Sequence, residues 1–233
     1  MPMLYIVATP IGNLEDITGR ALRVLAEADL IACEDTRHSL KLLNHYGLKT
    51  ARIALHSHNM KKSAPRLLEM LRQGKQIALI TDGGTPGISD PGSYLVAMAR
   101  AEGVKIVPIP GPSALSTILS IAGAPTGRCT FSGFLSPKAG RRRNQLKSLL
   151  DDGDPLVLFE SPHRILKLLE DLRRLAPART CLIGREMTKV HEEFLEGIPE
   201  KLLTELGGRT KIKGEFCLFV MGSDKKHQVE CQA

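Results

Sequence analysis

Short apolar runs alternate with amphipathic stretches through the first half of the chain. The runs end in glycine, proline or polar residues, as short buried strands do. We expect strands over residues 4–9, 30–34, 53–55, 76–81 and 105–109. The stretches between them have the spacing of helices, over residues 18–28, about 39–46, 63–74, 93–102 and 113–122. Because strands that alternate with helices pair in parallel, this half predicts an α/β sheet covered on both faces.

The second half follows a stretch rich in glycine and proline at residues 123–127 and restarts with the apolar segment 130–134. Its predicted elements are strands over 156–159, 179–184 and 215–220 and helices over about 141–150, 164–175 and 200–206. A polar–apolar alternation over 191–198 adds antiparallel character. We therefore predict an α/β protein of two α/β domains, at residues 1–112 and 125–223, with a flexible tail at 224–233.

Composition excludes several classes of protein. The chain has 233 residues, of which 42% are hydrophobic and 24% charged, as in ordinary soluble domains. No apolar run approaches the ~20 residues of a membrane span, and the N-terminus lacks the regions of a signal peptide. We therefore expect a cytoplasmic protein with no membrane segment. The five cysteines form no C-x-x-C pair, so neither a metal site nor a redox motif is predicted.

The distribution of charge is more informative than its total. A net charge of +7 favours a polyanionic partner without identifying one. Residues 128–147 contain six basic residues and no acidic residue. A solvated helix face would explain such a run, but the lack of a compensating acid favours a patch that contacts phosphate. The aromatic content of 4% argues against a surface that stacks on single-stranded bases.

Four loops follow the carboxyl ends of predicted strands, where ligands bind in open α/β sheets. They lie at residues 10–13, 34–37, 81–92 and 110–113, and we expect them to converge on one rim. The loop at 81–92 is rich in glycine, which lets backbone groups approach a ligand closely. Neither a Walker A motif nor the G-x-G-x-x-G dinucleotide fingerprint is present. The loops therefore favour a nucleoside-type ligand over ATP hydrolysis or NAD chemistry.

Two polar stretches in the second half could also carry chemistry. They cover residues 159–164 and 185–193. Glu160 and Glu186 directly follow apolar runs, so we expect both to be partly buried and either partnered or functional. A histidine such as His191, taken alone, is more often a surface or capping residue.

Taken in order, these segments resemble the tetrapyrrole methylase family. The matching stretches are residues 4–18, 34–37, 82–92, 110–114, 133–135, 159–164, 185–193 and 214–215. Residues 9–12 read Thr-Pro-Ile-Gly where the family usually has a Gly-x-Gly-x-Gly turn, and this substitution indicates its RNA-directed branch. The resemblance implies a cofactor cleft between the two domains that holds S-adenosyl-L-methionine. It also implies a homodimer and 2′-O-ribose methylation of a cytidine in the decoding region of 16S rRNA.

The resemblance and the loops together nominate site residues. The resemblance implies cofactor contacts from Ile11, Thr85, Ile88, Ser113, Ala114, Glu160, Met187 and Phe216, and the glycine-rich loop adds Gly84. A catalytic base is expected among Glu34, Asp35, Glu186 and His191, and the sequence does not choose between them. RNA contacts are expected from Arg37, Lys138, Arg141, Arg142, Arg143, Arg164 and Lys189. A structural ion pair between Asp35 and Arg37 is an equal alternative for those two residues.

Two other functions stay open at this stage. One is a methyltransferase that acts on a tetrapyrrole or another small molecule. The other is a non-catalytic RNA-binding protein that uses the same basic stretch. No metal is required by methyl transfer from a sulfonium, and none is expected.

Overall fold

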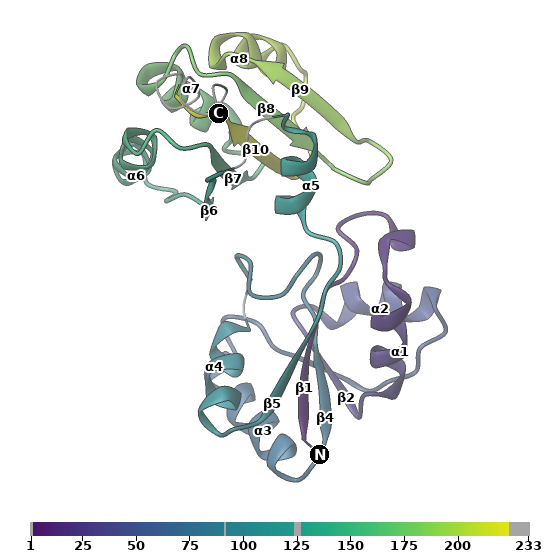
Figure 1. Cartoon of the computed structure of the whole chain (residues 1–233). Coiled ribbons are helices and arrows are strands. Elements are labelled where there is room, and N and C mark those ends of the chain that lie inside the picture. The colour runs from purple at the N-terminus through teal and green to yellow at the C-terminus, as the bar shows by residue number, and fades with distance from the viewer. Residues whose placement is uncertain (1, 91, 124–126, 224–233) are drawn as a thin grey trace. The chain divides into compact units, whose positions relative to one another are not determined.

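The computed structural model describes residues 2–90, 92–123 and 127–223. The chain divides into two compact units, and the division falls between Ser113 and Ala114 (Figure 1). The helix after this division, which the sequence placed between the two predicted domains, therefore belongs to the second unit. Residues 124–126 of the predicted linker, the predicted tail at 224–233 and Cys231 lie outside the described residues.

The first unit is built around a five-stranded parallel sheet with the strand order β3-β2-β4-β1-β5. Its elements are β1 (Met3–Val7), the 3-10 helix η1 (Leu14–Asp16), α1 (Gly19–Glu27), β2 (Leu30–Cys33), α2 (Thr36–His45), β3 (Arg52–Ala54), α3 (Met60–Arg72), β4 (Gln76–Leu79), α4 (Ser93–Ala101) and β5 (Lys105–Ile109). Helices α1 and α2 bury one face of the sheet, and α3 and α4 bury the other (Figure 1). This arrangement confirms the predicted parallel sheet covered on both faces.

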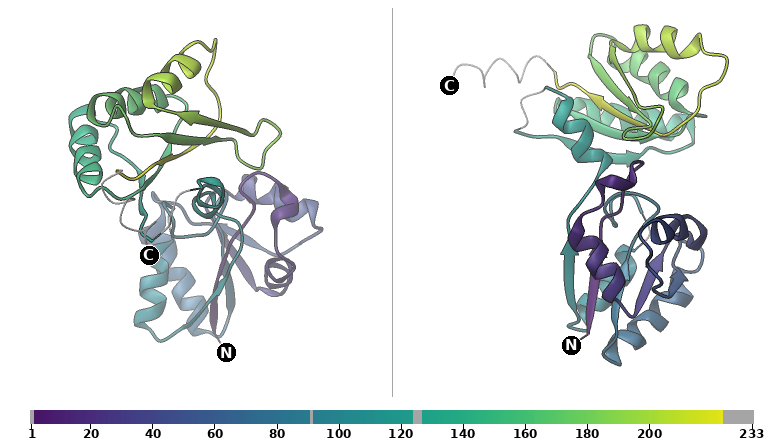
Figure 2. Two further views of the ribbon diagram at one scale, coloured as in Figure 1. Left: turned by 45° about the horizontal axis from the view of Figure 1, so that its top comes forward. Right: turned by 90° about the vertical axis from the view of Figure 1, so that its right-hand side faces the viewer.

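The second unit has a mixed sheet with the order β6-β7-β10-β8-β9. Its elements are α5 (Ala114–Ile121), β6 (Thr130–Phe134), α6 (Ala139–Asp151), β7 (Leu156–Glu160), α7 (Ile165–Leu175), β8 (Cys181–Arg185), β9 (Glu193–Gly197), α8 (Pro199–Gly207) and β10 (Phe216–Val220). Only the β6–β7 pair is parallel among the strand pairs described. Helices α6, α7 and α8 share one core with the sheet, and α5 packs against β10 (Figure 2).

Two helices of the first unit begin earlier than the sequence predicts. Helix α2 starts at Thr36 instead of about residue 39, because the Asp35 side chain caps it by accepting a hydrogen bond from the Arg37 backbone. Helix α3 starts at Met60 instead of residue 63, so Pro65 lies inside the helix rather than at its first turn. At this position proline removes the hydrogen bond that residue 65 would otherwise donate to the Lys61 carbonyl.

No helix among the described residues is long and apolar enough to cross a membrane. The cysteines in the described part of the chain are free thiols, and Cys33, Cys181 and Cys217 are buried. They pack as small apolar side chains in the cores, as the sequence predicts.

Candidate functional site

Three loops of the first unit are joined at the carboxyl edge of its sheet. Thr9 and Gly84 exchange both backbone hydrogen bonds, at 3.0 and 2.9 Å. The Thr85 hydroxyl donates to the Pro112 carbonyl at 3.2 Å. Gly84 has a φ of +87°, and a Cβ on it would lie 3.4 Å from Cγ2 of Ile11. Glycine is favoured here by the left-handed backbone, and any added Cβ would lie in van der Waals contact with Ile11.

A fourth loop joins the same edge through an acidic group. The Asp35 backbone N–H donates to Oδ1 of Asp82 at 3.1 Å, which ties residues 34–37 to the glycine-rich loop. The predicted convergence of the four loops is therefore confirmed. Cofactor candidates Ile11, Gly84 and Thr85 all lie at this edge.

Carboxyl groups of this edge influence one another. Burial, and next the charge of Asp82, raise the pKa of Glu34 above its ordinary value. Burial, and next the charge of Glu34, raise the pKa of Asp90 to about 6. Asp82 and Asp90 are not among the predicted site residues, because a glycine-rich loop indicates backbone contacts rather than side-chain chemistry. Two acids at the ends of a glycine-rich loop after a strand were the available signal.

The Asp35 carboxylate interacts with Arg37 at the start of α2. Its carboxylate accepts the Arg37 backbone N–H at 2.7 Å and pairs with the Arg37 guanidinium at 3.4 Å. The backbone hydrogen bond first, and then the side-chain bond, hold the pKa of Asp35 below its usual value. A carboxylate of lowered pKa is a weak proton acceptor, so the geometry favours the ion-pair alternative for Asp35 over a catalytic role.

The candidate cofactor residues of the second unit meet at one end of its sheet. Phe216 lies opposite Glu160 on β7 and opposite Arg185 on β8. The next residue, Cys217, contacts the Ala114 carbonyl with its sulfur at 3.8 Å. Met187 follows β8 and is buried against Gly184, where any added Cβ would collide with the methionine sulfur.

Glu160 is the most unusual polar group at this end. Its side chain is fully buried, and Oε1 accepts the Ser161 backbone N–H at 2.8 Å. Oε2 lies 3.1 Å from the Arg164 guanidinium but accepts no hydrogen bond among the described residues. A buried carboxylate oxygen with spare acceptor capacity fits a ligand that brings N–H or O–H donors.

The turn between β8 and β9 is held by its own charges. Oε1 of Glu186 accepts from the Lys189 ammonium at 2.8 Å and from the Glu215 backbone at 2.9 Å. Burial alone would raise the pKa of Glu186, but the hydrogen bonds from Lys189 and Glu215 outweigh it and lower that pKa. Lys189 also pairs with the Glu215 carboxylate at 2.8 Å. Glu186 is therefore a weak proton acceptor and Lys189 is engaged within the protein, while His191 is exposed on the turn.

The structure corrects part of the predicted RNA-binding set. Arg142 is buried, with a side chain 5% exposed, and its Nε donates to Asp171 at 2.7 Å. It is therefore not available to a phosphate, and Asp171 is the compensating acid that the sequence did not show beside it. Arg164 is also engaged, donating to the Leu135 carbonyl at 2.6 Å. The side chains that remain exposed are those of Arg37, Lys138, Arg141 and Arg143.

The chain belongs to the tetrapyrrole (corrin/porphyrin) methylase family, whose model matches residues 3–202. The predicted family and fold class are confirmed.

Two individual relatives and one solved structure are similar to the chain. The chain is 45% identical to the ribosomal RNA small subunit methyltransferase I of Halalkalibacterium halodurans, over 97% of this chain and 78% of that protein. It is 47% identical to the protein of the same name from Haemophilus influenzae, over 99% of this chain and 83% of that one. The crystal structure of diphthine synthase matches with a TM-score of 0.73 at 18% identity, over 94% of this chain and 90% of that chain. This last likeness concerns the fold alone.

Proposed function

We propose that the chain transfers a methyl group from S-adenosyl-L-methionine to the 2′ hydroxyl of a cytidine in the decoding region of 16S rRNA. The observation that carries the proposal is the 45–47% identity, over nearly the whole chain, to proteins named ribosomal RNA small subunit methyltransferase I. The family itself supplies methyltransferase activity and the cofactor class. The choice of the ribose oxygen rests on the resemblance to the RNA-directed branch of the family.

The residues of each unit fit this cofactor. The first unit offers the exposed backbone of Gly83 and a rim of carboxylates that attracts a sulfonium cation. The second unit offers the spare acceptor of Glu160 to the amino and hydroxyl donors of an adenosine. The residues proposed to hold the cofactor are Ile11, Gly84, Thr85, Ile88, Ser113, Ala114, Glu160, Met187 and Phe216.

The bound cofactor would supply an activated methyl on a good leaving group. The task of the protein is then to align a ribose hydroxyl with that methyl and to accept its proton. Glu34 is the best base among the predicted candidates, because its raised pKa makes it the stronger proton acceptor at the rim. Among the described residues no group of three or more His, Cys, Asp or Glu side chains could hold a metal ion.

The proposal also includes a binding partner, an oligomeric state and a cellular location. The partner is the small ribosomal subunit or its 16S rRNA, and an rRNA substrate implies the cytoplasm. The family resemblance supports a homodimer.

The test is a methyl-transfer assay with radiolabelled S-adenosyl-L-methionine and three acceptors: 30S subunits, free 16S rRNA and a porphyrin precursor. Label should enter 30S subunits or 16S rRNA. The modified position should resist alkaline cleavage, because a 2′-O-methyl group removes the hydroxyl that attacks the phosphodiester. Digestion to nucleosides should return the label in a cytidine.

The two alternative functions would each give a different experimental result. Label in the porphyrin precursor alone would support the small-molecule methyltransferase. Binding of rRNA with no saturable heat of S-adenosyl-L-methionine binding in calorimetry would support a non-catalytic RNA-binding protein. Either result would overturn the proposal.

A further inference from the structure

A groove runs between α6 and α7 on the second unit. It has a volume of about 360 Å³ and includes Arg143 of α6 and Lys167 of α7 in its lining. The buried pair of Arg142 and Asp171 also lines it, and this pair joins the two helices at 2.7 Å. The spacing between the side chains of the two helices is therefore fixed by a charge-assisted hydrogen bond.

The charges in the groove do not cancel. Arg142 is neutralised by Asp171, and Arg174 is neutralised by Glu170 at 2.8 Å. Among the described residues, the side chains of Arg143 and Lys167 form no ion pair, and both are exposed. The groove therefore retains two cations that have no carboxylate partner, from two different helices.

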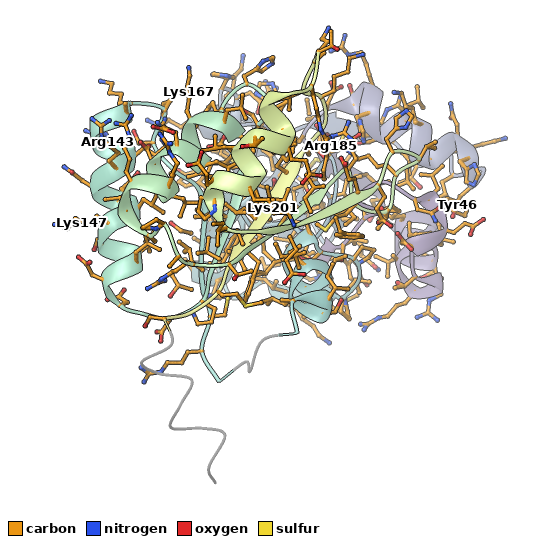
Figure 3. All side chains as sticks on the ribbon, turned by 90° about the horizontal axis from the view of Figure 1, so that it is seen from above. Tyr46, Arg143, Lys147, Lys167, Arg185 and Lys201 are labelled. Carbon is orange, nitrogen blue, oxygen red and sulfur yellow. The ribbon has the colours of Figure 1, made fainter. Side chains whose placement is uncertain are left out.

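The positive surface continues along α6. Lys147 follows Arg143 by four residues and so lies on the same side of the helix (Figure 3). Lys138 and Arg141 add exposed positive charge at the start of α6. At about 1.5 Å per residue, a helix of this length spans roughly 20 Å, which is longer than any single small anion. A row of cations of this length can contact several successive phosphates of a nucleic-acid backbone.

We infer that the α6–α7 groove is a docking surface for the phosphate backbone of the rRNA substrate, with Arg143 and Lys167 each contacting a phosphate. The inference rests on the proposed function and adds to it the face that receives the RNA. Arg142 and Asp171 touch no RNA and hold the two cationic helices at a fixed spacing. Phosphate contacts of this kind orient a nucleic acid without reading its sequence.

The experiment uses the full chain and leaves Arg142 in place, because its removal would disturb the helix pair. The test variant is Arg143→Gln with Lys167→Gln. The matched control is Arg20→Gln with Arg23→Gln, which removes the same charge from two exposed arginines of α1 in the first unit. A charge-retaining variant, Arg143→Lys with Lys167→Arg, separates charge from shape.

Binding to 16S rRNA is measured by filter retention between about 50 and 200 mM salt, where phosphate contacts dominate. Each lost contact removes roughly 0.7–0.9 from the log–log salt slope, so the test variant should lose about 1.4–1.8. At about 0.1 M salt this is a weakening of roughly 25-fold to 60-fold. In the methyl-transfer assay the KM for RNA should rise while kcat holds, and calorimetry should give unchanged affinity for S-adenosyl-L-methionine.

The control should keep the wild-type slope, and the charge-retaining variant should recover most of the affinity. An unchanged slope in the test variant, or an equal loss in the Arg20 and Arg23 control, would overturn the docking surface while wild-type methylation of rRNA stands. Failure of the wild-type protein to methylate rRNA would instead remove the proposed function, and the docking inference with it.

Discussion

Breaking the buried pair between Arg142 and Asp171 should be among the most damaging single changes in the second unit. Both side chains are almost fully buried, 5% and 4% exposed, and Nε lies 2.7 Å from Oδ2. With charge centres about 4 Å apart and an effective dielectric of about 20, the attraction is about 4 kcal/mol. Arg142→Met leaves the Asp171 carboxylate buried without its partner, which costs about 3–5 kcal/mol.

Replacing both partners should cost far less than replacing one. The double variant Arg142→Met with Asp171→Leu removes two charges that were both desolvated, so we expect most of the stability to return. The assay is urea-induced unfolding followed by far-UV circular dichroism, with free energies taken from the linear dependence on denaturant. Arg143→Met, one position along the same helix and exposed, is the control and should change stability by less than about 0.5 kcal/mol.

The reasoning fails on either of two results. One is a cost below about 1 kcal/mol for Arg142→Met, the value of a surface pair. The other is additivity, in which the double variant loses the sum of its single losses, because paired charges must couple.

Further predictions concern the first unit and the assembly. Gly84→Val should abolish S-adenosyl-L-methionine binding in calorimetry and also destabilise the fold, since φ is +87° and Ile11 lies 3.4 Å from the new Cβ. The control is Gly74→Val, at a position with a φ of +88° and open space around it. This variant introduces the backbone strain without a steric clash and should still bind S-adenosyl-L-methionine. Glu34→Gln should lower kcat by about 10²-fold or more and remove the acid limb of the pH–rate profile. The pKa of Asp90 is about 6 in the folded protein, against an ordinary value of 3.8. Ionisation of Asp90 therefore opposes folding, and it does so fully once the pH is above the folded pKa. Asp90→Asn should therefore raise the urea midpoint at pH 8 and leave it nearly unchanged at pH values about one unit below the unfolded pKa, with a gain at pH 8 discounted for solvent screening to about 1–2 kcal/mol. Light scattering at micromolar concentration should give the mass of a dimer, and a monomer mass would reject the homodimer.

Local patterns were sufficient for the strands and for the loop rim of the first unit. Strand β5 was predicted at its observed bounds, since its apolar run ends in proline and glycine. The start of α2 was not predicted, because the sequence alone does not show that the Asp35 side chain caps this helix.

Long-range partners explain why the sequence did not show the surroundings of two candidate residues. Arg142 looked like its neighbours because its partner, Asp171, lies 29 residues further along the chain. Glu186 gave no sign of its bond to the Glu215 backbone, which is again 29 residues away. A linear pattern records which residues are charged, whereas the pairing of those charges depends on which helices and strands become neighbours.

The position of β10 has a consequence for how the protein is made. This strand lies between β7 and β8 in the sheet, and its five residues are all buried. It is nevertheless the last strand of its sheet to be synthesised, so β7 and β8 each have an open edge until residue 220 has left the ribosome. The strands of the first sheet, in contrast, are complete by residue 109. All strands of the first sheet have therefore been synthesised while the central strand of the second sheet is still missing. During that interval the unpaired edges of β7 and β8 are exposed to aggregation or to chaperones.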